Sequence, residues 1–406
     1  EMLVTGDFLT VQINFEPFWE KPPLFIWMQA LSMWIFGVNE FAARFPNAVC
    51  GVVTLLLLFN IGRIIHNSRF GLIWVLAYAG SVLPFIYFKS GIIDPWFNLF
   101  IFISIICWFY TAFSKRKYLL TFLSALFLGL AVLTKGPVSV IIFGILFIFL
   151  LFFREFRKTF TWKQFILFAF TLLITGGFWF ILQIMNGNFS IIKDFIVYQI
   201  RLFKTRDAGH GGFPLYHFVI ILVGVFPASV FAIAGHKFNN LTGNNRLLHI
   251  SMIVLLWSVL ILFSIVKTKI IHYSSLAYFP LTYLGGYAIT EIIDNKRNYT
   301  LWLKILTFFI GSIFAMLSIA LPWLYMYRDH FIEKGYITDP FVIGNLQAET
   351  GWGWYISLAG VLLISALSAA MFIHRKQRAR SFVIILCSTM IFTLSCILMI
   401  TKGAEK

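Results

Sequence analysis

Long apolar runs, separated by short polar connectors, repeat along almost the whole chain. Twelve such runs follow an opening polar segment, and they lie near 46–63, 71–88, 95–113, 118–133, 137–153, 164–185, 214–235, 248–266, 272–291, 302–325, 352–373 and 381–400. A helix needs about 20 predominantly apolar residues to cross a membrane. The pattern therefore predicts an all-α polytopic membrane protein with about twelve transmembrane helices.

The opening segment, residues 1–45, is predicted to be an outer loop that carries one shorter helix, while residues 46–406 form the transmembrane domain. Glu20 and Lys21 are followed by two prolines, which fix φ and are tolerated in the first turn of a helix. The apolar run over 24–36 is too short to cross a bilayer. We expect it to lie in the membrane interface, with either a functional acid–base pair or a plain surface ion pair at its start.

Composition supports this class and removes one alternative. Hydrophobic residues make up 60% of the chain and charged residues only 12%, whereas a soluble domain has about 25% charged residues. The net charge of +16 would suggest a nucleic-acid partner in a soluble protein. Here the basic residues fall in the connectors between apolar runs, so we do not expect nucleic acid to bind.

The distribution of charge predicts the orientation. Every second connector is short and basic, and these six connectors together hold 18 of the 32 lysines and arginines but only 3 of the 16 acids. The positive-inside rule places them in the cytoplasm. The long polar segments 1–44, 186–213 and 326–351 then lie outside, where we expect the chemistry.

Two outer positions combine charge with an apolar setting. Asp94 opens an apolar run, where a carboxylate either caps the helix or acts in a site. Lys135 lies in a Thr-Lys-Gly-Pro turn between two short runs. A desolvated ammonium there needs an anion, which is either a carboxylate of the protein or a ligand phosphate.

Three further candidates lie in later outer segments. Arg201 and His210 belong to a basic, glycine-containing loop, in which His210 and a distant carboxylate such as Glu20 could bind a divalent metal such as Zn, Mg or Mn. A lone histidine more often only forms hydrogen bonds. Lys269 belongs to a Lys-Thr-Lys motif, where it either contacts an anion or snorkels to the membrane surface. A cation-rich pocket with a few acids at the membrane surface suits a lipid phosphate whose head group is processed there.

Several motifs, taken in order, resemble the polyprenyl-phosphate-sugar-dependent glycosyltransferases, which have the GT-C fold and include the lipid A aminoarabinose transferases and the protein O-mannosyltransferases. The resemblance covers about residues 1–290. Its motifs are Gly6-Asp7-Phe8, Phe18-Trp19-Glu20-Lys21-Pro22-Pro23-Leu24, Phe36-Gly37-Val38-Asn39-Glu40-Phe41-Ala42-Ala43-Arg44, Asp94-Pro95, Leu133-Thr134-Lys135-Gly136-Pro137, Gly209-His210-Gly211, and Lys267-Thr268-Lys269 with His272-Tyr273 and Pro280.

The resemblance implies inverting transfer of a sugar from an undecaprenyl-type phosphate carrier to a lipid A, glycolipid or protein acceptor. The expected place is the outer face of the bacterial inner membrane. Lys21 is then expected near the catalytic acid and the carrier phosphate, Asp94 is the acid of the second loop, and Glu20 with His210 are candidate metal ligands. We add Lys135, Arg201 and Lys269 as phosphate contacts, a choice that rests on their charge and place.

One departure and two alternatives accompany this interpretation. The Asp-Glu pair that carries the catalytic acid in the family lies upstream of the position that matches Glu1, so we expect the given sequence to be N-terminally incomplete and inactive as it stands. A flippase of lipid-linked sugars is one alternative, although an internal repeat and charged mid-span positions are lacking. A ligase or polymerase of lipid-linked glycans is the other.

Overall fold

The computed structural model describes residues 1–205, 211–238, 241–347 and 353–404. The chain forms two compact units, which are described separately. The first unit contains residues 1–58, 87–221 and 238–281, and the second contains residues 59–86, 222–237 and 282–406.

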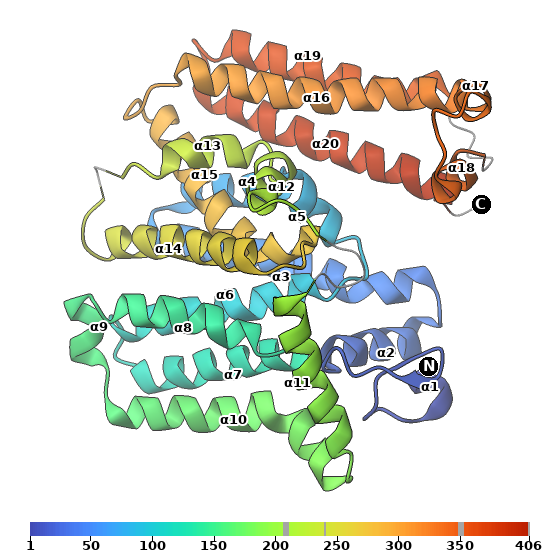
Figure 1. Ribbon diagram of the computed structural model, residues 1–406. Helices are drawn as coiled ribbons and strands as arrows, with labels where there is room; N and C mark the ends of the chain where they lie inside the picture. The colour runs from blue at the N-terminus through green and yellow to red at the C-terminus, as the bar shows by residue number, and fades with distance from the viewer. Residues whose placement is uncertain (206–210, 239–240, 348–352, 405–406) are drawn as a thin grey trace. The chain divides into compact units, whose positions relative to one another are not determined.

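The first unit holds the opening segment and most of the helices of the first two thirds of the chain (Figure 1). Its elements are α1 (Met2–Thr5), β1 (Gln12–Ile13), β2 (Glu16–Pro17), α2 (Leu24–Phe36), most of α3 (Glu40–Ile65), α6 (Asp94–Thr111), α7 (Lys117–Lys135), α8 (Val138–Leu150), α9 (Arg154–Thr159), α10 (Trp162–Met185), α11 (Phe189–Lys204), most of α12 (Tyr216–Gly224), α14 (Gly243–Ile265) and η2 (Ile271–Ala277).

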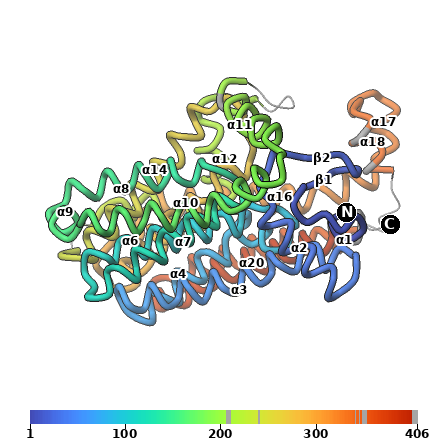
Figure 2. Tube along the Cα trace, turned by 90° about the horizontal axis from the view of Figure 1, so that it is seen from below, coloured from blue at the N-terminus to red at the C-terminus, as the bar shows by residue number. Residues whose placement is uncertain are grey.

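Helices α6, α7, α8 and α10 run side by side in this unit, as Figures 1 and 2 show. α6 is predominantly apolar and largely buried, with Leu99, Ile101 and Phe102 fully buried. The Ser104 and Ser124 hydroxyls lie 3.1 Å apart across the α6–α7 contact, so a polar pair joins two otherwise apolar helices.

The opening segment folds as predicted around a short apolar helix. α2 spans Leu24–Phe36, as the prolines before it and Gly37 after it indicate, so the expected helix is confirmed. A two-residue antiparallel hairpin precedes it, and Asn14 and Phe15 at its turn have positive φ values of 54° and 63°. Positive φ at both central residues is typical of a type I′ turn, which matches the twist of the two strands.

The second unit is built from the remaining helices. They are α4 (Ser68–Ala79), α5 (Val82–Tyr87), α13 (Ala228–Gly235), most of α15 (Tyr278–Ile293), α16 (Leu301–Met326), α17 (Arg328–Glu333), α18 (Pro340–Gln347), η3 (Trp354–Ile356), α19 (Ser357–Ile373) and α20 (Arg378–Ala404). Phe231, Tyr299 and Phe382 meet in its core, with the ring centroids of Phe231 and Phe382 5.3 Å apart. α16, α19 and α20 pack side by side (Figure 1).

All twelve predicted runs are helical, although not all are single spanning helices. Within the described part of the chain, eight helices are long and apolar enough to cross a membrane. The run over 214–235 is bent by 113° between α12 and α13, and the run over 71–88 breaks between α4 and α5. α8 has 13 residues and α15 has 16, since Pro137 starts the first and a 3₁₀ turn precedes the second. The protein is an integral membrane protein, and the all-α class is confirmed.

Candidate functional site

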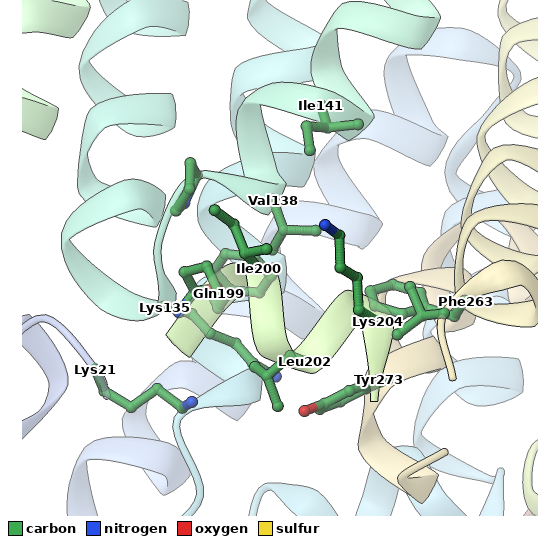
Figure 3. Close-up of a pocket in the computed structure, with 13 residues that line it drawn as sticks. Lys21, Lys135, Val138, Ile141, Gln199, Ile200, Leu202, Lys204, Phe263 and Tyr273 are labelled. Carbon is green, nitrogen blue, oxygen red and sulfur yellow. The ribbon is translucent and has the colours of Figure 1, made fainter. Parts of the chain in front are cut away.

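Four segments that the charge pattern places outside meet at one cavity of the first unit. The cavity has a volume of about 390 Å³. It is lined by Lys21 of the first loop, by Lys135 and Val138 beside the α7–α8 turn, and by Phe263, Val266 and Tyr273 around the end of α14. Helix α11 contributes Gln199, Ile200, Leu202 and Lys204. Figure 3 shows Lys21 and Tyr273 reaching into the opening from opposite sides, with Lys135 beside them.

Lys135 has a carboxylate partner within the protein. Its ammonium lies 2.5 Å from the Oδ1 atom of Asp94, and the other carboxylate oxygen, Oδ2, lies 3.8 Å from His272 Nε2. The Asp94 side chain is only 3% exposed, while that of Lys135 is 12% exposed. The carboxylate therefore holds the ammonium at the cavity wall. Of the two partners expected for Lys135, the protein carboxylate is present as Asp94, while a ligand contact for the same ammonium stays a prediction.

Asp94 does not cap its helix. α6 begins with Ile93 as the N-cap residue and has no side-chain cap hydrogen bond, and Asp94 lies in the first turn. The capping alternative is therefore wrong. A carboxylate in this turn still gains from the positive end of the helix dipole, but its oxygens face Lys135 and His272 instead of the backbone N–H groups.

The turn that presents Lys135 requires glycine. Gly136 has φ +111°, and a Cβ atom there would lie 3.0 Å from the ring of Phe195 on α11. Pro137 follows as the N-cap residue of α8. The turn thus ends α7 directly after Lys135, and the lysine side chain is fixed at the rim of the cavity. Its ammonium also lies 4.9 Å from the centroid of the Tyr273 ring.

Lys21 and Arg201 meet at one aromatic ring. The Lys21 ammonium lies 4.9 Å from the centroid of Tyr198, and the Arg201 guanidinium lies 5.0 Å from the same centroid. Tyr198 is buried. Cation–π contacts of this kind orient a cation without neutralising its charge. Lys21 and Arg201 are therefore brought together by Tyr198, an uncharged residue that a search for charged positions does not find.

The segment that carries Arg201 was expected to be a polar loop, yet it is largely the helix α11. Its apolar side is marked by Phe195 and Tyr198, which are both buried, and its other side exposes Ile196, Val197 and Ile200. Arg201 and Lys204 fall in the last turn, where the helix dipole favours cations. The three-residue spacing of Phe189, Ile192, Phe195 and Tyr198 was a signal for this helix, but interspersed charges obscured it.

Lys269 lies beside the cavity in contact with the protein backbone. Its ammonium donates to the Phe263 and Ser264 carbonyls, each at 2.7 Å, and so satisfies two acceptors at the end of α14. Burial lowers the pKa of this lysine. The neighbouring Thr268 hydroxyl lies 3.2 Å from the Leu202 carbonyl and 2.9 Å from that of Thr205. The Lys-Thr-Lys segment thus links the ends of α14 and α11.

Lys21 and Lys135 gather at one end of the cavity, which we call the cationic end, and a mostly apolar wall with one further lysine, Lys204, forms the other. Lys21, Lys135 and Tyr273 share one end in Figure 3, while Val138, Ile141 and Ile200 line the other. Lys204 of α11 runs beside Val138. A ligand that fits both ends has an anionic head and an apolar tail.

The first loop is tied to the helices that surround this cavity. The Asp7 carboxylate accepts hydrogen bonds from the Leu9 and Thr10 amides at 2.8 and 3.0 Å. Burial raises the pKa of Asp7, but these hydrogen bonds outweigh it and leave the pKa below its usual value. The Leu9 carbonyl in turn accepts from Trp179 Nε1 at 2.8 Å and Gln183 Nε2 at 3.1 Å on α10. The Gly-Asp motif therefore positions the loop that carries Lys21.

The proposed metal ligands do not form a complete set here. Glu20 lies next to Lys21, half-buried, while His210 lies outside the described residues. Among the side chains that the structure describes, no three of the types His, Cys, Asp and Glu come together to hold a metal ion. Carboxylate and imidazole suit a divalent metal by type, but these two residues alone leave the site short of ligands. We therefore derive no step through a metal.

Comparison with known proteins gives this arrangement a family context. Residues 20–179 match the family model described as dolichyl-phosphate-mannose-protein mannosyltransferase. A crystal structure of ArnT from Cupriavidus metallidurans bound to undecaprenyl phosphate superposes with a TM-score of 0.79 at 17% sequence identity, and covers 99% of this chain and 71% of that chain. This chain has the GT-C fold. The resemblance noted in the sequence is confirmed.

Curated relatives extend the match along the chain. An undecaprenyl phosphate-alpha-4-amino-4-deoxy-L-arabinose arabinosyl transferase of Shewanella sediminis (strain HAW-EB3) is 24% identical over 91% of this chain and 68% of its own length. Two uncharacterized proteins of Aquifex aeolicus (strain VF5) are 28% and 30% identical over 79% and 71% of this chain. The chain spans 62% and 65% of their lengths, which is less than two thirds of these relatives.

The segment that matches the family model contains only some of the residues around the cavity. The matched family segment contains Lys21, Asp94 and Lys135, and α11 together with the segment after α14 lies beyond it. The structural match covers both parts of the chain. The residues that form the cationic end of the cavity therefore come from inside and outside the segment that the family model describes.

Proposed function

We propose that this GT-C protein transfers a sugar from a polyprenyl phosphate carrier to an acceptor of the bacterial envelope. The observation that carries the proposal is the cavity of the first unit, which combines the Lys21 and Lys135 ammonium groups at one end with a mostly apolar wall, to which Lys204 adds one further charge. The relatives named as undecaprenyl phosphate sugar transferases support the choice of carrier. We further propose that the site faces outward from the inner membrane, as the charge pattern indicates.

We place the carrier phosphate at the cationic end of the cavity. Lys21 and Lys135 would contact the phosphate oxygens. The Arg201 guanidinium, which lies against the same Tyr198 ring as Lys21, would add positive charge nearby. Lys269 is the weaker candidate, because two of its three N–H groups already donate to carbonyls. The first prenyl carbons would follow the apolar wall beside Val138 and Ile141.

The proposed reaction is a single displacement at the anomeric carbon. The acceptor hydroxyl attacks that carbon, the bond to the phosphate oxygen breaks, and its electron pair leaves with the polyprenyl phosphate. The hydroxyl proton passes to a carboxylate base. Attack from the face opposite the leaving group inverts the anomeric configuration. The cations stabilise the negative charge that the departing phosphate gains in the transition state.

Asp94 is proposed to act through Lys135 in this reaction. Its buried carboxylate holds the ammonium, and His272 lies at its second oxygen. In this role Asp94 is a positioning residue that fixes a phosphate-binding cation. Electrostatic stabilisation of this kind works best when the charged group is held in place before the reaction begins.

The test uses the protein produced from its full reading frame and purified in detergent. Supplied with an undecaprenyl-phosphate-linked sugar and lipid A or a peptide acceptor, it should release undecaprenyl phosphate only when the acceptor is present. Lys21→Ala should lower kcat/KM for the donor by about 10- to 100-fold, the loss expected for one charged phosphate contact. Lys193→Ala, which removes an exposed lysine at the other end of α11, serves as the matched control.

Two results would overturn the proposal. The first is the absence of release with any supplied sugar and acceptor, combined with movement of intact lipid-linked sugar across liposomes, which would establish a flippase. The second is equal release by wild type and Lys21→Ala, which would show that the carrier phosphate does not bind at this end of the cavity.

A further inference from the structure

A second cavity, distant in sequence from the proposed site, lies within the second unit. Its volume is about 650 Å³, and it opens where α15 ends and where the connector joins α19 to α20. The lining consists of Ile293, Asn295 and the six consecutive residues 375–380. Four of these six are basic, namely Arg375, Lys376, Arg378 and Arg380. We call these four residues the basic groove.

Within the residues that the structure describes, no carboxylate pairs with the basic groove. The nearby Asp294 carboxylate is already bonded to Arg69 Nη1 at 2.8 Å. Four cations around one opening repel each other, so the groove favours an anion.

The orientation of α20 strengthens this preference. Arg378 and Arg380 lie in its first turn, which contains no acidic residue. The N-terminus of a helix carries partial positive charge, so cations there are unfavourable and an anion beside them is favourable. Both guanidinium groups are also held in place: Arg378 Nη1 donates to the Ile292 carbonyl at 3.0 Å, and Arg380 Nη1 donates to Gln377 Oε1 at 2.6 Å.

The positive charge of this region also affects the pKa of a neighbouring histidine. His374, directly before the groove, is buried, and its Nδ1 atom has no hydrogen-bond partner among the described residues. Burial, together with the smaller effects of the Lys304 and Arg378 charges, lowers its pKa to about 4. His374 is therefore neutral at pH 7 and does not add to the charge of the groove.

Exposed apolar side chains begin next to these cations. On α19 the Phe372 side chain is 87% exposed, and on α20 the Val383 side chain is 44% exposed. Each lies within about one helical turn of a basic residue of the groove. Charged positions that pass directly into exposed apolar ones match the border between the head groups and acyl chains of a membrane.

We propose that the basic groove binds the phosphate group of an anionic phospholipid, whose acyl chains lie along α19 and α20. The lipid belongs to the leaflet that faces the cytoplasm in the proposed orientation, because the connector between α19 and α20 is among the basic connectors. A free phosphate ion shares the charged group but cannot use the apolar flanks. The proposal does not depend on the sugar-transfer reaction.

The test measures lipid retention by native mass spectrometry of the full protein in detergent. Phosphatidylglycerol and phosphatidylcholine are added separately, and the fraction of protein with one bound lipid is compared. Wild type should retain phosphatidylglycerol preferentially. Since each basic residue near an anionic lipid contributes about fivefold in affinity, Arg375→Gln/Lys376→Gln should weaken retention by about 30-fold. These two residues are exposed and make no side-chain hydrogen bond in the described structure, so folding should be kept.

The matched control is Arg157→Gln/Lys158→Gln, which removes the same charge from exposed positions on α9 of the first unit. It should retain phosphatidylglycerol as wild type does, and so should Arg375→Lys, which keeps the charge. Equal loss in the control, or unchanged retention in Arg375→Gln/Lys376→Gln, would overturn the proposal. Full displacement of the lipid by millimolar inorganic phosphate would also overturn it, because the ligand would then be a soluble anion.

Discussion

At the scale of single residues, the contact between Asp94 and Lys135 allows effects on stability and on activity to be tested separately. We expect Asp94→Asn to lower the free energy of unfolding by about 3 kcal/mol, because it leaves an ammonium of low exposure without its counter-charge. Asp94→Asn/Lys135→Met should recover most of that stability, since no uncompensated charge remains. Both variants should lose most of the transfer activity. Thermal unfolding in detergent and donor kinetics measure the two effects separately.

The contradicting outcome for this pair is specific. If Lys135→Met bound the donor with an unchanged KM and kcat, the ammonium would serve folding alone. A loss of activity in the double variant at recovered stability would instead assign the pair a part in the reaction, because folding could no longer explain the loss.

Lys269 allows its structural and binding roles to be separated. Lys269→Met keeps the apolar stem but removes the donors for the Phe263 and Ser264 carbonyls. We expect the free energy of unfolding to fall by about 1 to 3 kcal/mol, the cost of leaving buried acceptors without a partner. The donor KM should change little. A large increase in KM at unchanged thermal stability would instead support a direct phosphate contact.

At the scale of elements, the turn between α7 and α8 fixes both the end of one helix and the start of the next. Gly136→Ala should destabilise the protein by about 1 to 2 kcal/mol, since φ +111° is unfavourable for alanine, and its Cβ would crowd Phe195 on α11. Gly144→Ala, inside α8 with open space around its Cβ, should be neutral or stabilising. Thermal unfolding of both variants tests the contrast, and similar losses would contradict it.

The Thr268 hydroxyl helps to hold the end of α11. Thr268→Val removes the contacts with the Leu202 and Thr205 carbonyls, and we expect faster amide hydrogen exchange in the last turn of α11. Thr268→Ser, which keeps the hydroxyl, should exchange as wild type does. Because Arg201 and Lys204 lie in that turn, the donor KM of Thr268→Val should rise as well. Unchanged exchange would show that packing of Phe195 and Tyr198 alone holds the helix.

At the scale of the whole molecule, orientation follows from charge and is directly testable. In a variant without the four native cysteines, Lys193→Cys should react with a membrane-impermeant maleimide from outside the cell. Lys376→Cys should react only after the membrane is opened. The positive-inside rule predicts this difference, because residue 376 lies in a basic connector and residue 193 in a long outer segment. Labelling of both from the same side would contradict the proposed orientation.

The sequence by itself determined the membrane-protein class, most of the helices and the GT-C fold. Apolar runs, prolines and glycines act over one or two helical turns, so the bounds of α2 and the positions of α6, α7 and α10 could be predicted from the local pattern. The ordered motifs from Gly6 to Pro280 identified the GT-C fold, because several weak matches in a fixed order are specific together.

Only the tertiary structure decided which charges meet. Asp94 and Lys135 are 41 positions apart, and nothing in the sequence around either residue names the other as its partner. The bend between α12 and α13, the helix α11 and the backbone contacts of Lys269 likewise depend on packing against distant segments. Hydrophobic periodicity records which face of a helix is buried, but not which helix covers it, and electrostatic partners are chosen by that packing.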